Sequence, residues 1–112
     1  MKDFMLIFLG GSDAMNLSPD EMQKHMQKWF DWIDKLKNKS IYVSGEALTP
    51  GGKTVKGPKA VISDGPFAES KEVVGGYFIV KAKSLEDATE IAKDCPDLPF
   101  NGVVEVREVM KF

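Results

Sequence analysis

The chain has 112 residues, of which 43% are hydrophobic and 29% are charged. This length fits one domain over residues 1–112, and the balance is that of a folded rather than a disordered protein. The formal net charge is −2, so no basic excess is present to neutralise a phosphate backbone, and direct nucleic-acid binding is not expected.

The first predicted elements are a buried strand and a long helix. Residues 4–9 form an apolar run that is too short to span a membrane. We recognise no targeting signal and expect a cytoplasmic protein with no membrane segment. Ser18-Pro19-Asp20-Glu21 predicts a helix start with Ser18 as cap, and the helix should end near residues 37–40. Its apolar stripe, expected to be core rather than a ligand surface, comprises Met22, Met26, Trp29, Ile33 and Leu36.

The rest of the chain predicts further strands and one more helix. We expect strands over residues 41–48, 59–63, 77–83 and 103–112, with turns at 49–52 and 64–66. Gly45 interrupts the first of these strands, and Gly75-Gly76 indicates close backbone approach in a strand. Ser84 predicts the cap of the second helix, which Pro96 stops. The buried stripe of that helix should comprise Leu85, Ala88, Ile91, Ala92 and Cys95.

This order of elements predicts an α+β fold with a ferredoxin-like split βαβ pattern. Two helices can cover only one face of the antiparallel sheet. The strands at residues 4–9 and 77–83 nevertheless carry apolar side chains on both faces. Burial of the uncovered face against a second copy is the simplest solution, so we expect a homodimer.

Residues 63–96, SDGPFAESKEVVGGYFIVKAKSLEDATEIAKDCP, resemble the YCII-related family. The tetrapeptide Asp64-Gly65-Pro66-Phe67 is similar to the signature of its DGPF subgroup, and residues 45–48 and 104–107 agree with that subgroup. The resemblance implies a dimeric α+β barrel, in which two ferredoxin-like sheets pack face to face.

The resemblance implies less about function, because most members have no assigned reaction. Some relatives resemble muconolactone isomerases and chloromuconolactone dehalogenases, for which a His–Asp pair has been proposed as the catalytic core. Many DGPF members resemble proteins encoded beside extracytoplasmic-function sigma factors, which implies a regulatory context.

His25, the only histidine, matches the first-helix histidine of the family. The resemblance suggests His25 as general acid/base and Asp64 as the carboxylate that orients its ring. Glu46, at the end of the second predicted strand, is the alternative acid. The competing interpretation makes His25 a boundary residue and Asp64 a turn residue without a function.

Four further residues are candidates for substrate binding. Trp29 and Phe67 would wall an apolar pocket, and Lys71 or Arg107 would anchor an anion. The alternatives are a solvated loop for Lys71 and a salt bridge for Arg107.

The first hypothesis is a small enzyme with isomerase- or lyase-like proton-transfer chemistry on a small carboxylate or lactone. One alternative is a non-catalytic dimer that binds a small ligand or a regulatory protein. In the other, the candidate site residues only stabilise the fold. A single histidine and a single cysteine, Cys95, argue against a transition-metal site. No phosphate loop, dinucleotide fingerprint or nucleophile elbow is present, so we expect no cofactor.

Overall fold

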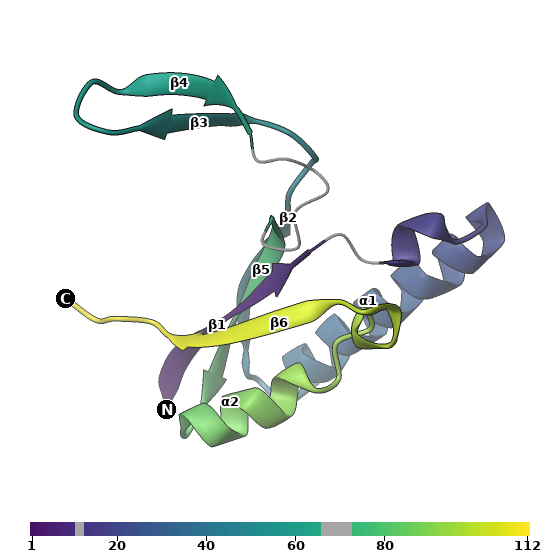
Figure 1. Cartoon of the computed structure of the whole chain (residues 1–112). Coiled ribbons are helices and arrows are strands. Elements are labelled where there is room, and N and C mark those ends of the chain that lie inside the picture. Colours follow the sequence, from purple (N-terminus) through teal and green to yellow (C-terminus); the bar gives the residue numbers. More distant parts are fainter. Residues whose placement is uncertain (11–12, 66–72) are drawn as a thin grey trace.

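The main layer of the protein is a four-stranded antiparallel sheet in the order β2-β5-β1-β6. The computed structural model describes residues 1–10, 13–65 and 73–112 (Figure 1). This strand order, interleaved with two helices, is that of a ferredoxin-like fold. The predicted α+β class is therefore confirmed. The strands are β1 (Lys2–Leu9), β2 (Tyr42–Ala47), β5 (Val74–Ala82) and β6 (Val103–Glu108).

Both helices lie on the same face of this sheet (Figure 1). They are α1 (Pro19–Asn38) and α2 (Leu85–Ala92), and two 3-10 turns, η1 (Asp13–Asn16) and η2 (Leu98–Phe100), flank them. The hydroxyl of Ser18 accepts a hydrogen bond from the Glu21 amide at 3.2 Å, and that of Ser84 accepts one from the Asp87 amide at 3.2 Å. Both predicted caps are thus confirmed, because each satisfies an amide that has no partner within the helix.

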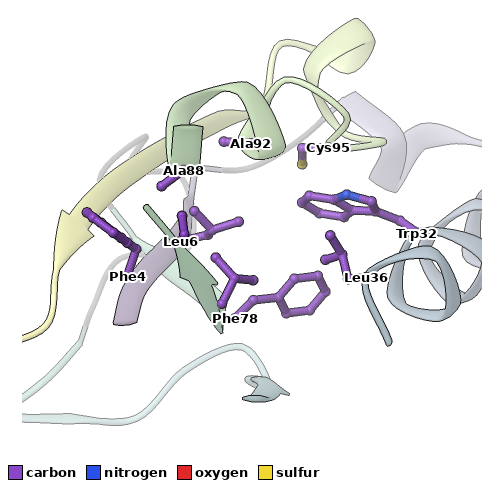
Figure 2. Packing of buried hydrophobic residues seen from close by; sticks show 10 residues of the cluster. Phe4, Leu6, Trp32, Leu36, Phe78, Ala88, Ala92 and Cys95 are labelled. Carbon is purple, nitrogen blue, oxygen red and sulfur yellow. The ribbon is translucent and has the colours of Figure 1, made fainter. Parts of the chain in front are cut away.

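The hydrophobic core lies between the sheet and the two helices (Figure 2). Side chains alternate along β1, so that Phe4 and Leu6 are fully buried while Met5 and Ile7 point to the opposite face. The small side chains of α2 let that helix approach the sheet closely. The core comprises Phe4, Leu6, Phe78, Val80 and Ala82 from the sheet, Trp32 and Leu36 from α1, and Ala88, Ala92 and Cys95 from the α2 region.

The buried side of α1 differs from the predicted stripe. His25, Trp32 and Leu36 are its buried residues, whereas Met26 is 44% exposed. The reason is that α1 packs on the sheet through the Trp32 side of its apolar surface. The Met26 side is left facing a cavity, which a helical period alone cannot distinguish from the core. In α2, Leu85 is likewise exposed rather than buried.

A hairpin of β3 (Lys53–Lys56) and β4 (Val61–Asp64) forms a separate two-stranded sheet between β2 and β5 in the chain. It extends away from the main sheet (Figure 1), and all its strand residues are exposed. The sequence predicted β4 but not β3, because the short segment KTVK has no buried apolar run to mark it. The last strand also ends at Glu108, before the predicted residue 112.

Two glycines are explained by close contacts in the sheet. A Cβ atom at Gly76 would lie 2.7 Å from the Glu46 carbonyl oxygen, which confirms the predicted close approach of the backbone. A Cβ atom at Gly45 would lie 2.6 Å from Cδ1 of Phe78 and 2.7 Å from the Tyr42 hydroxyl. Glycine at position 45 therefore makes room for two aromatic rings on the helix side of the sheet.

The other face of the sheet is not covered by helices. Its centre is apolar, and its β6 margin is charged. Register places Met5 opposite Ile79 and Arg107, and Ile7 opposite Tyr77 and Glu105. The four apolar side chains are only partly buried. Within the described part of the chain, no helix is long and apolar enough to cross a membrane.

Candidate functional site

A cavity of about 380 Å³ opens between α1 and the ends of β1, β2 and β5. Its volume lies in the range of small-molecule sites. Most of its lining is apolar, with Met26 and Ile33 from α1 among the aliphatic residues. Its aromatic residues are Phe8, Trp29, Phe30, Tyr42 and Phe78.

His25 and Asp97 form a hydrogen-bonded pair on the wall of this cavity. Nε2 of His25 lies 2.6 Å from Oδ1 of Asp97, and the indole Nε1 of Trp29 donates to the same oxygen at 3.4 Å. The side chain of His25 is 5% exposed and that of Asp97 is 26% exposed. The carboxylate is therefore the more accessible member of the pair.

The hydrogen bonds of His25 indicate its protonation state. An ionised carboxylate can only accept, so Nε2 of the ring is the donor. Nδ1 is buried without a hydrogen-bond partner among the described residues. Protonation of Nδ1 would leave a buried, charged N–H without an acceptor, which is costly. The geometry thus favours a ring that carries its proton on Nε2 and none on Nδ1.

A tight loop after α2 positions Asp97. Its carbonyl oxygen accepts hydrogen bonds from the amides of Phe100 and Gly102, both at 2.9 Å. Asn101 has a φ of 64°, and a Cβ atom at position 102 would lie 2.7 Å from Cβ of Asp97. Only glycine lets the loop close this tightly. The ring of Phe100 also packs edge-on against His25, with 5.0 Å between centroids.

The predicted pairing of His25 with Asp64 is corrected by this arrangement. Asp64 ends β4 on the outer hairpin, where it forms an ion pair with Lys53 and its side chain is 87% exposed. The acid on His25 is Asp97 instead. Glu46, the alternative acid, lies on the rim of the cavity in β2, and it too is not the hydrogen-bond partner of His25.

The four predicted substrate-binding residues do not all lie at the cavity. Trp29 lines the cavity and also bonds Asp97. Arg107 lies opposite Met5 in the β1–β6 register, so it sits on the face of the sheet away from the cavity. It cannot anchor a ligand in the cavity of its own chain. Phe67 and Lys71 lie outside the described residues.

Asp97 was missed because nothing local marks it as functional. It follows Pro96, which was interpreted only as the end of a helix, and it lies 72 positions from His25. An acid in a loop is ordinarily solvated. One signal was available: Asp97 comes two residues after Cys95. The apolar pattern predicted that Cys95 is buried, and the structure confirms this.

Two further groups on the cavity wall have raised pKa values. Burial, followed by the carboxylate of Glu46 and the neighbouring Tyr77, raises the pKa of Tyr42. Burial raises the pKa of the Cys95 thiol to about 11. Both groups are therefore uncharged at neutral pH. In the described ranges, no group of three or more His, Cys, Asp or Glu side chains is placed to hold a metal ion.

The fold and the cavity define a ferredoxin-like α+β protein with a His–Asp pair on the wall of an apolar cavity. The chain matches the YCII-related domain over residues 4–112 and belongs to that family. It is also similar to an uncharacterized protein of Rhizobium meliloti (strain 1021), with 38% identity over 50 residues. That similarity covers 44% of this chain and 40% of the relative.

Proposed function

We propose that the cavity binds a small molecule and that the His25–Asp97 pair transfers a proton to or from it, in isomerase- or lyase-like chemistry. The observation that carries this proposal is the 2.6 Å hydrogen bond between His25 Nε2 and Asp97 Oδ1 on the wall of an apolar cavity. Such pairs are a common device for general acid–base catalysis.

The exposed fractions of the two side chains support one division of roles. Asp97 is the member that a ligand can reach, so it is the proton acceptor and donor. His25 is a positioning residue, because its Nε2 is bound to Asp97 and its Nδ1 is buried. Trp29 holds the same carboxylate oxygen from the side. These roles reverse those expected from the family resemblance, in which the imidazole exchanges the proton.

Hydrogen exchange tests this function even while the natural substrate is unidentified. Small ketones and lactones, whose carbonyl groups make the neighbouring carbon-bound protons acidic, are incubated with the protein in D2O, and loss of these protons is followed by NMR. Exchange should fall by at least about 100-fold in Asp97→Asn, since general acid–base groups contribute factors of this size. Asp64→Asn is the matched control, because this acid lies on the outer hairpin. Undiminished exchange in Asp97→Asn would contradict the assignment.

A second candidate function is non-catalytic ligand binding. The observation that favours it is the burial of His25, which leaves neither ring nitrogen free to meet a ligand. This alternative predicts a ligand that raises the unfolding midpoint by mass action without any exchange or turnover. Detection of exchange that depends on Asp97 would exclude it.

Assembly as a homodimer is part of the proposal. The sheet face that the helices leave uncovered carries partly exposed Met5, Ile7, Tyr77 and Ile79. Two copies related by a two-fold axis would bury this surface against itself. The tetrapeptide that begins at Asp64 also supports membership of the DGPF subgroup, although the acid of the proposed site is Asp97.

A further inference from the structure

The charges on the cavity wall indicate which ligands it accepts, if the cavity is the small-molecule site proposed above. Among the described lining residues, Asp97 and Glu46 are acidic and none is a lysine or arginine. We infer that the ligand is an apolar organic cation, such as an arylalkyl or aliphatic amine, whose ammonium group pairs with Asp97. This class differs from the carboxylate or lactone expected from the sequence.

Asp97 has the capacity and the charge to bind a cation. Its Oδ1 accepts from His25 and Trp29, whereas a carboxylate offers about four acceptor sites over its two oxygens. The donor at His25 Nε2 and the buried Nδ1, which has no partner in the described ranges, favour a neutral ring. The pair therefore carries a net negative charge, which an ammonium group would neutralise in a partly desolvated position.

The aromatic wall favours the same charge. The rings of Phe8, Trp29 and Phe78 are grouped at centroid distances of 4.9 to 5.8 Å. Ring faces carry negative potential and attract ammonium groups within ~6 Å of a centroid. In β2, which also lines the cavity, burial and the Glu46 carboxylate raise the pKa of Tyr42. The Glu46 carboxylate is thus a second negative charge in the wall of the cavity.

The same cavity is unfavourable for an anionic ligand. Its carboxylate would have to lose water beside the charge of Asp97 without a described cation in the cavity wall to compensate it. Arg107, the described candidate for an anion anchor, is on the other face of the sheet. Repulsion and desolvation thus act together against an anion.

Three probes of similar shape test the inference: 2-phenylethylammonium, 2-phenylethanol and 3-phenylpropanoate. Each is titrated into ¹⁵N-labelled full-length protein at low salt, and the two tryptophan indole peaks are followed. Trp29 lines the cavity and reports binding there, whereas Trp32 is buried in the core outside the cavity lining and should shift less. The Trp29→Phe variant assigns the peaks. The cation should shift the Trp29 peak and bind at least about tenfold more tightly than the anion.

Variants connect the preference to Asp97. In Asp97→Asn the preference for the cation over the anion should largely disappear, whereas Asp97→Glu and Asp64→Asn should retain it. Equal or tighter binding of 3-phenylpropanoate to the wild-type protein would overturn the inference and leave the proposed small-molecule site intact. Failure of all three probes to shift Trp29 would contradict both. The comparison of cation and anion binding to the wild-type protein tests the inference even if Asp97→Asn does not fold.

Discussion

The carboxylate of Asp97 and the imidazole of His25 are joined by a 2.6 Å hydrogen bond across 72 positions of the chain. His25 comes from the first half of α1, and Asp97 comes from the loop after α2. The pair therefore connects the two helical segments at the wall of the cavity. Under the proposed function, the charge of this pair selects the ligands of the cavity.

The first prediction concerns the tautomer of His25. Because Asp97 accepts from Nε2, the neutral ring should carry its proton on Nε2, with Nδ1 unprotonated. A long-range ¹H–¹⁵N NMR spectrum distinguishes the two nitrogens, and the lone histidine needs no assignment. Asp97→Ala should remove the preference, whereas Asp64→Asn should leave the spectrum unchanged. A ring protonated on Nδ1 in the wild-type protein would contradict the geometry.

The second prediction compares the effect on stability of alanine at two adjacent glycines, Gly75 and Gly76. Gly76→Ala should destabilise the protein by about 1–3 kcal/mol, because the new Cβ would lie 2.7 Å from a carbonyl oxygen of β2. Gly75→Ala is the matched control, since its Cβ would make an ordinary 3.8 Å contact with the Phe8 carbonyl oxygen. Urea unfolding of the two variants measures the difference. Equal stabilities would show that the β2–β5 pair is looser than described.

The third prediction follows from the raised pKa of Cys95. Its pKa is about 11 in the folded protein against a reference of 9.0. Between these values the unfolded chain loses the proton while the folded chain keeps it, so rising pH favours unfolding. The thiol should therefore lower the unfolding free energy by up to about 2–3 kcal/mol between pH 9 and 11.

Comparison with Cys95→Ala isolates this contribution, because every other ionisable group is present in both proteins. Urea unfolding free energies are measured across the same pH window. The wild-type curve should fall more steeply than that of the variant. Parallel curves would mean that the thiol reaches water more readily than its 4% exposure indicates.

The fourth prediction tests the proposed dimer. Ile7→Glu places a charge in the centre of the uncovered sheet face and should convert a dimer to a monomer, because the charge would be buried without a partner. Leu85→Glu is the control, since Leu85 is exposed on α2. Sedimentation velocity gives the assembly state of each protein. A monomeric wild-type protein, or a variant that still dimerises, would contradict this interface.

Local patterns in the sequence determined the elements that build the fold. Ser18 and Ser84 were recognised as caps because a cap depends only on residues a few positions away. The apolar run of β1 and the small residues of α2 likewise indicated a two-layer α+β fold. The order of these elements along the chain then matched a ferredoxin-like split βαβ pattern.

The tertiary structure alone decided which polar groups meet. Helical periodicity placed Met26 in the core, but the packing of α1 on the sheet leaves it at a cavity. Family resemblance led to Asp64, but the hairpin carries that residue outward, and a loop closed by Gly102 brings Asp97 to His25 instead. Contacts between residues this far apart depend on packing and register, which no local pattern encodes. The sequence by itself therefore determined the α+β fold and singled out His25 as a candidate site residue, whereas packing decided the hydrogen-bond partner of His25 and which charged side chains line the cavity.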